Sequence, residues 1–181
     1  MEKVCLDLGS GEKCHKVAEK MIDSLKGSAL KQPLGNFDTR CDEKGRIRLP
    51  GSWLHFFTHD LNDKKVFCTS LDGTVIRIYP ESIWRFNLSL FEELADQSED
   101  VERILTLANH YGTESDLDAS GRILIKAELR KELELVGDEV VGTGKKGVIH
   151  VYRKADHDAL IKNFKTVAPD AIQALTRLGM R

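Results

Sequence analysis

The chain has 181 residues, of which 41% are hydrophobic and 31% charged, so it can bury a core and is not a disordered segment. No run of about 18 apolar residues is present, and the first stretch lacks the apolar centre of a signal peptide; we therefore expect a cytoplasmic protein with no membrane segment. The net charge of −2 excludes a globally basic surface, so nucleic-acid binding would need a local patch of cations.

The N-terminal residues 1–34 contain a predicted amphipathic helix. Its apolar stripe is formed by Val17, Met21 and Leu25, and it ends before Gly27. The spacings of the cysteines match neither a metal-binding pair nor a secreted disulfide framework. We therefore expect free thiols at Cys5, Cys14, Cys41 and Cys68.

An internal repeat is the strongest signal in the sequence. The segments DEKGRIRLP, from Asp42, and DASGRILIK, from Asp118, share the pattern D-x-x-G-R-I-x-[LI]. A β-rich tail follows each segment, at 74–79 and at 147–152. The chain therefore contains two copies of one small module.

Each repeated segment predicts a strand, a tight turn and a second strand. Asp42 and Asp118 can accept hydrogen bonds from backbone N–H groups across their own turns. Gly45 and Gly121 are expected to adopt positive φ, which glycine does without strain. The arginine after each glycine should lie on the outer rim of its turn. Short helices are expected at 53–57 and 127–133.

The segment between the copies predicts a helical spacer. Residues 81–111 form two amphipathic patterns separated by the polar stretch 96–100, and a further helix is expected at 155–164. The resulting division has five parts. These are an N-terminal extension (1–34), a first module (35–86), a spacer (87–111), a second module (112–165) and a C-terminal helix (166–181).

The duplicated turn, the spacer and the segment Tyr79-Pro80-Glu81-Ser82-Ile83-Trp84 resemble the MraZ family over about residues 35–165. The resemblance implies an α+β, β-rich fold in which two AbrB-like swapped-hairpin half-barrels form a pseudo-symmetric double β-barrel. It also implies a ring-shaped homo-oligomer that associates with the nucleoid. Such a ring would bind direct repeats in promoter DNA and repress its own cluster of cell-division and cell-wall genes. The typical family member lacks the N-terminal extension.

Cations around the two turns are the predicted contacts to double-stranded DNA, because a row of them can neutralise successive phosphates and arginine can read guanine. The alternative is that they are ordinary solvated surface charges. The first copy ends its motif with Pro50, whereas the second has Lys126. We therefore expect base reading by the first turn and phosphate contact by the second. The predicted DNA-binding residues are Arg40, Lys44, Arg46, Arg48, Arg122 and Lys126.

Other candidate sites are weaker, and no enzymatic activity or cofactor is expected. His55 and His59 have the i, i+4 spacing of a zinc pair but lack the adjacent glutamate of a metalloprotease. Residues 142–147 resemble a phosphate-binding loop, but a hairpin turn explains them better. The acids around His157 are placed to favour a helix N-terminus.

A rival hypothesis is a ring-forming structural or adaptor protein without specific DNA binding. The acidic isoelectric point and the altered second motif are compatible with it. Antitoxin-like regulation is a further alternative, although that class usually carries one module per chain.

Overall fold

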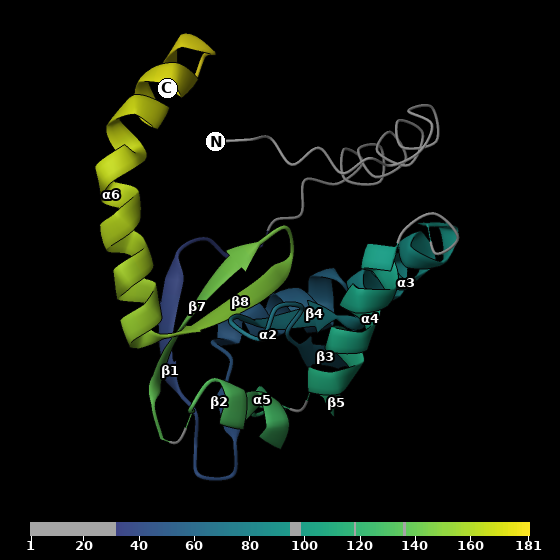
Figure 1. The fold of residues 1–181 in the computed structure, drawn as a ribbon. Helices are drawn as coiled ribbons and strands as arrows, with labels where there is room; N and C mark the ends of the chain where they lie inside the picture. The colour runs from purple at the N-terminus through teal and green to yellow at the C-terminus, as the bar shows by residue number, and fades with distance from the viewer. Residues whose placement is uncertain (1–31, 95–98, 118, 136) are drawn as a thin grey trace.

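The computed structural model describes residues 32–94, 99–117, 119–135 and 137–181 (Figure 1). The helix predicted around Met21 lies outside the described residues, as do Cys5 and Cys14. Cys41 and Cys68 are buried free thiols, as predicted. Within the described ranges, no helix is long and apolar enough to cross a membrane.

Both copies contain the same series of strands and α-helices, and the first also has a π-helical turn. The first copy comprises β1 (Asn36–Arg40), β2 (Arg46–Arg48), α2 (Gly51–His55), a π-helical turn η1 (Phe56–Asp60), β3 (Lys65–Thr69), β4 (Ile76–Pro80) and α3 (Glu81–Leu94). Helix α4 (Glu99–Tyr111) precedes the second copy. The second copy comprises β5 (Thr113–Asp116), β6 (Arg122–Leu124), α5 (Ala127–Glu132), β7 (Glu139–Lys145), β8 (Val148–Arg153) and α6 (Lys154–Arg177).

The two copies exchange strands. The larger sheet is antiparallel with the order β1-β7-β8-β4-β3-β5, so the first strand of each copy pairs with the hairpin of the other copy. A separate two-stranded ribbon joins β2 to β6, again one strand from each copy. Each sheet therefore needs both copies, and the structure is α+β with a large antiparallel sheet.

A pseudo-twofold axis relates the copies. In the ribbon, Ile47 is the register partner of Ile123, which occupies the same place in the second motif. In the larger sheet, Arg77 is the register partner of His150, its counterpart in the β-rich tail of the second copy. Both pairs of equivalent residues meet across strands, and the axis therefore passes through both the ribbon and the sheet.

The main core lies between the larger sheet, the ribbon and the short helices α2 and α5. Its fully buried side chains include Trp53, Phe57, Ile123 and Leu129. In the ribbon the alternating pattern turns Ile47 and Ile123 towards this core, as strand periodicity requires. A second buried cluster forms where α3 and α4 pack against strands β3 and β4, around Trp84 and Ala108.

Two helices occupy the spacer region, and the C-terminal helix is longer than expected. Helix α3 ends at Leu94 and α4 begins at Glu99, close to the break expected from the polar stretch 96–100. The helix expected at 155–164 is α6, which continues to Arg177 and includes Pro169. Because α3 spans position 86 and α6 spans position 165, the secondary structure is continuous across two of the expected domain boundaries.

Candidate nucleic-acid interface

The first turn is fixed by its own aspartate. Asp42 Oδ1 accepts the backbone N–H of Arg46 at 2.8 Å, and the Gly45 N–H donates to the Asp42 carbonyl, also at 2.8 Å. The Arg46 side chain returns to the same carboxylate, with Nε donating to Oδ2 at 2.9 Å. These hydrogen bonds from Arg46 lower the pKa of Asp42. The Arg46 guanidinium is therefore partly neutralised by the residue that forms the turn.

Gly45 has φ +78, and the other copy covers it. A Cβ added there would collide with the Arg130 guanidinium, whose Nε donates to the Ile125 carbonyl at 3.1 Å. Arg130 therefore buttresses the first turn from helix α5. In the sequence this cation follows the second turn, and the strand exchange brings it to the first.

The glycine of the second turn is also covered by the other copy. Gly121 has φ +62, and Leu54 of α2 is the nearest side chain to the space that a Cβ would occupy. Backbone hydrogen bonds also join the two turns. The Leu49 N–H donates to the Gly121 carbonyl, and the Ile125 N–H donates to the Gly45 carbonyl. Asp118 lies outside the described residues.

The outer face of the ribbon, opposite the core, carries Arg46, Arg48, Arg122 and Leu124. Arg48 and Arg122 are exposed and are direct register partners across β2 and β6. Leu124 is 43% exposed and occupies the place that Arg48 holds in the first copy. The duplication has therefore left an asymmetric face, with two arginines opposite each other and a third arginine opposite a leucine.

The Arg48–Arg122 pair is expected to lower the stability of the ribbon. Side chains directly opposite each other on one face of an antiparallel pair have Cβ atoms about 5 Å apart, and like charges at that separation repel. The six residues of the ribbon, all of them described, include no acidic side chain. A bound anion would relieve this repulsion, which makes the pair suited to phosphate or to the electronegative edge of a base.

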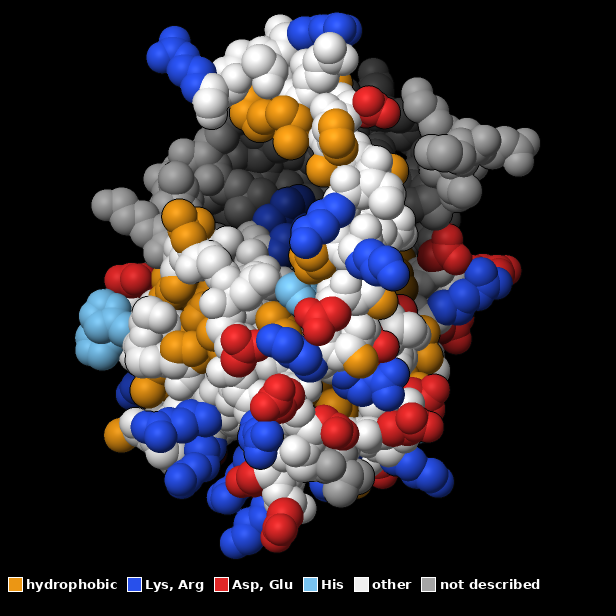
Figure 2. Space-filling model, turned by 90° about the vertical axis from the view of Figure 1, so that its left-hand side faces the viewer, with side chains coloured by type: hydrophobic (Ala, Val, Ile, Leu, Met, Phe, Trp, Pro, Cys, Tyr) orange, Lys and Arg blue, Asp and Glu red, His pale blue; other side chains and the backbone are white. Residues whose placement is uncertain are grey.

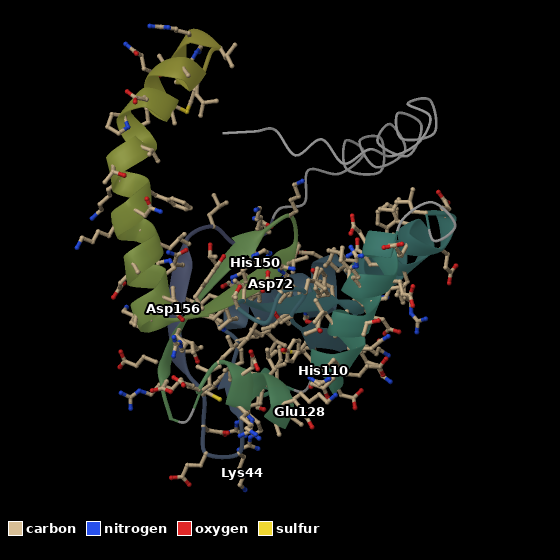
Figure 3. All side chains as sticks on the ribbon, in the orientation of Figure 1. Lys44, Asp72, His110, Glu128, His150 and Asp156 are labelled. Carbon is tan, nitrogen blue, oxygen red and sulfur yellow. The ribbon has the colours of Figure 1, made fainter. Side chains whose placement is uncertain are left out.

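The remaining expected cations divide into two groups. Lys44 is exposed at the tip of the loop that precedes β2, at the lower end of the molecule (Figure 3). Arg40 is exposed on β1 and bonds Glu139 of β7 at 3.0 Å. Lys126, by contrast, donates from Nζ to the His110 carbonyl at 2.6 Å and so occupies the C-terminal end of α4. The structure brings Lys44, Arg46, Arg48 and Arg122 to one end of the molecule. The Lys126 side chain instead binds the carbonyl at the end of α4.

The different roles expected for the two turns assumed that replacing proline with Lys126 changes the geometry of the second motif, and the backbone at this position shows no such change. Pro50 precedes α2 with φ −60 and ψ 150, and Lys126 precedes α5 with φ −54 and ψ 144. At this position the backbone is therefore the same in both copies, because Lys126 adopts the conformation that proline would impose. The first turn holds Arg46 through Asp42, and this restraint was not part of the sequence-based expectation.

Known proteins similar to this chain identify its family. The family model described as "MraZ protein, putative antitoxin-like" matches residues 111–177. The transcriptional regulator MraZ of Acidobacterium capsulatum is 31% identical over 148 residues, covering 81% of this chain and 98% of that protein. The chain belongs to the MraZ family. The MraZ of Koribacter versatilis is 31% identical over 108 residues, covering 59% of this chain and 73% of that protein.

The other motifs of this MraZ chain have structural explanations. Residues 142–147 form the end of the β7–β8 hairpin, where Lys146 and Gly147 both have positive φ, as a tight hairpin turn requires. Asp156 lies in the first turn of α6 and accepts Arg153 Nε at 2.6 Å. The rings of His55 and His59 stack at 4.4 Å, and the described residues contain no cluster of three or more potential metal ligands.

Sequence reasoning missed three residues of the MraZ ribbon region. Leu124 was interpreted only as part of a β-rich segment, although the repeat alignment places it opposite Arg46 once the strand exchange is known. Thr39 and Ser115 are the equivalent hydroxyl residues of β1 and β5. They bond the Arg48 carbonyl and the Leu124 N–H, respectively, and tie each strand of the ribbon to the larger sheet.

Proposed function

We propose that this MraZ family member is a DNA-binding transcriptional regulator. In this proposal it represses its own cluster of cell-division and cell-wall genes by binding direct repeats in the promoter. The curated relatives carry the name transcriptional regulator MraZ, which supports the class of function. A chromosomal target would place the protein at the nucleoid.

The outer face of the ribbon carries this proposal. A ribbon of two antiparallel strands fits the DNA major groove, where arginine can donate to guanine. The Arg48–Arg122 pair provides two adjacent cations there, with Lys44 and Arg46 beside them. We propose Arg48 and Arg122 as the principal contacts, Arg46 as a contact weakened by Asp42, and Arg40 as a flanking phosphate contact.

The exchange of strands supports the finer description of the fold. In a swapped-hairpin double barrel, each half is completed by strands of the other half. The pairing of β1 with β7, of β5 with β3 and of β2 with β6 follows that scheme. We propose this architecture for the two copies, with the ribbon as the element that presents the arginines.

A ring-shaped homo-oligomer would multiply this face. Each protomer contributes one ribbon, and a closed ring would repeat the ribbons at a fixed spacing, which suits direct repeats in DNA. Weak binding by each ribbon would then add up only on correctly spaced repeats.

The test of the proposal is binding of the purified chain to the DNA upstream of its own gene. Fluorescence anisotropy with the upstream fragment and with a shuffled fragment of equal length measures the preference. We expect at least a hundred-fold preference at about 150 mM salt, on the scale of specific over non-specific binding. Equal affinity for both fragments at every salt concentration would contradict sequence-specific regulation.

An adaptor or antitoxin-like role is the second candidate. The description of the matching family model as antitoxin-like favours it, as does the neutralisation of Arg46 by Asp42. A protein of this class would form the oligomer and bind a protein partner without a DNA preference. The anisotropy experiment separates the two candidates, because only the regulator distinguishes the upstream fragment from the shuffled one.

A further inference from the structure

Two exposed histidines stand on a helical segment that is anchored in the core. The rings of His55 and His59 stack in parallel, with centroids 4.4 Å apart and an interplanar angle of 5°. Viewed from the side of α6, histidine side chains gather at one edge of the surface and stand clear of it (Figure 2). The inner face of the same segment carries Trp53, Phe56 and Phe57, which are almost completely buried. The backbone beneath the two rings is therefore held in place.

Among the described residues, only the first copy carries this histidine pair on a π-helical turn. Helix α2 continues into η1, where the Leu61 N–H donates to the Phe56 carbonyl at 3.0 Å. The equivalent helix α5 ends at Glu132, and Lys131 takes the place of His55 in the second motif. Turns of the π type are rare and occur frequently at functional sites. The histidine pair is therefore a feature of one copy and is not required by the shared fold.

Hydrogen bonds determine which nitrogen of His59 carries the proton. The Thr58 hydroxyl donates to the Leu54 carbonyl at 2.8 Å, and its oxygen also lies 2.8 Å from His59 Nδ1. A hydroxyl has one hydrogen and a carbonyl can only accept, so Thr58 Oγ1 must accept from an Nδ1–H group. A neutral His59 ring therefore has its free lone pair on Nε2. Metal-binding histidines are usually oriented in this way, by an acceptor bound to the nitrogen that does not contact the metal.

The spacing of the two rings permits both to bind one metal ion. Side chains four residues apart lie on the same face of a helix. Metal–nitrogen bonds of about 2.0–2.1 Å at a tetrahedral angle place the two nitrogens about 3.3 Å apart. The ring centroids are 4.4 Å apart, so the rings need to approach each other by about 1 Å on the metal side. Both side chains are exposed, and rotation of their own bonds provides this movement without a shift of the backbone.

We propose that His55 and His59 chelate one divalent transition-metal ion, such as Ni²⁺, Cu²⁺ or Zn²⁺. Neutral imidazole suits these ions, whereas Mg²⁺ and Ca²⁺ prefer oxygen ligands. A structural zinc site has four protein ligands, whereas this site has two, so water completes the coordination and the metal binds reversibly. The site involves neither the ribbon nor DNA, and the inference therefore does not rest on the proposed function.

Isothermal titration of the full chain with NiCl₂, in a non-coordinating buffer at neutral pH, provides the first test. We expect one Ni²⁺ ion to bind at this site and to remain bound in about a hundred-fold excess of Mg²⁺. His55→Ala and His59→Ala should each weaken binding about ten-fold or more, because a single imidazole remains. The matched control is His110→Ala, which removes another exposed histidine and should leave binding unchanged. A second control, Cys14→Ser with His15→Ala, removes two adjacent donors elsewhere in the chain and should also leave it unchanged.

The role of Thr58 is tested by the tautomer of His59. Nitrogen NMR of the metal-free chain should show the proton of the neutral His59 ring on Nδ1. Thr58→Val removes the acceptor and should both abolish this preference and weaken Ni²⁺ binding about ten-fold, the lower end of the range for such partners. Thr58→Ser keeps the hydroxyl and should preserve both properties. Circular dichroism should show that both variants are folded, because the change is nearly isosteric.

Four results would overturn the inference. The first is the absence of Ni²⁺ binding by the wild type. Unchanged affinity in both His55→Ala and His59→Ala, or loss of binding in the Cys14→Ser, His15→Ala variant, would place the metal elsewhere in the chain. A proton on Nε2 of the neutral His59 ring would show that Thr58 does not orient the ring for metal binding.

Discussion

The two copies of the module share the order and pairing of their strands but use equivalent side chains differently. At the ribbon, the first copy has Arg48 where the second has Leu124, and at the sheet the first has Arg77 where the second has His150. At the short helices, Leu54 covers one turn glycine and Arg130 covers the other. The copies thus agree at the positions that form the fold and differ at those that face solvent or the axis.

This difference shows which constraints the fold imposes. The positions that must match are the turn glycines and the inward isoleucines, because strain or a cavity at either would break a sheet shared by both copies. The positions that differ lie on the outer face of the ribbon or next to the axis, where one copy can keep a cation without the other. The predictions below test the shared positions first and the divergent ones after.

The largest effect is expected at the shared core of the ribbon. Ile123 is fully buried against its counterpart Ile47, and Ile123→Ala should lower the free energy of unfolding by about 3 kcal/mol through lost burial and a residual cavity. Ile47→Ala should cost a similar amount, because the axis places the two residues in equivalent environments. Urea unfolding of both variants measures this. A large loss in one variant beside near-wild-type stability in the other would show that the core is not shared equally.

A pH-dependent loss of stability is expected from His150, the register partner of Arg77 next to the pseudo-twofold axis. Burial, together with the charges of Arg77 and Lys145, lowers the pKa of His150 to about 4. Its folded pKa thus lies below its unfolded value near 6.5, so the unfolded state takes up the proton first as the pH falls. Stability from this residue is complete above pH 6.5 and is lost between about 6.5 and 4.

The size of that loss is roughly 2 kcal/mol, reduced from the full linkage value because His150 remains partly accessible to water. Urea unfolding of the wild type and of His150→Gln from about pH 7.5 to 4 measures it. The difference between the two curves should grow as the pH falls through this range. A constant difference would show that His150 titrates equally in both states.

Asp42→Asn tests whether the Asp42 carboxylate restrains the Arg46 side chain. The amide oxygen can still accept the Arg46 N–H, but the negative charge that pairs with the guanidinium is gone. We expect tighter binding to non-specific DNA and a salt slope steeper by about one unit, because one more cation is free to contact phosphate. Glu43→Gln removes the same charge from the same loop and should change the slope less. Equal slopes for the two variants would mean that Asp42 does not hold Arg46 away from DNA.

The smallest effect is expected at the last position of the motif. Lys126→Pro restores the residue of the first copy, and its backbone already has φ −54 and ψ 144. The free energy of unfolding should therefore change by less than about 0.5 kcal/mol, the small loss coming from the bond to the end of α4. Thermal unfolding measures it. A loss as large as the one expected for Ile123→Ala would show that the equivalence of the two backbones is incomplete.

The repeated motif predicted much of this molecule because local chemistry dictates it. The turn from Asp42 to Gly45, the two helices of the spacer and the hairpin at Gly147 all follow from residue types whose preferred conformations act over a few positions. The family resemblance came from the same local signals, and the match to the Acidobacterium relative confirms it.

The rest depends on contacts between distant residues. Nothing near Arg130 in the sequence indicates that it lies against Gly45, and nothing near Arg48 indicates that Arg122 will be its register partner. The strand exchange creates both contacts.

The central claim is that the Arg48–Arg122 pair lowers stability and provides the DNA site. Its most direct test measures urea unfolding and anisotropy on the upstream fragment for Arg48→Gln and Arg122→Gln, with Arg40→Gln as the control. We predict that each ribbon variant raises the free energy of unfolding by about 0.2–1 kcal/mol, because the like-charge pair is relieved. Each should at the same time lose about 1–3 kcal/mol of binding free energy per site. Wild-type affinity in both ribbon variants, whether or not stability rises, would contradict the account.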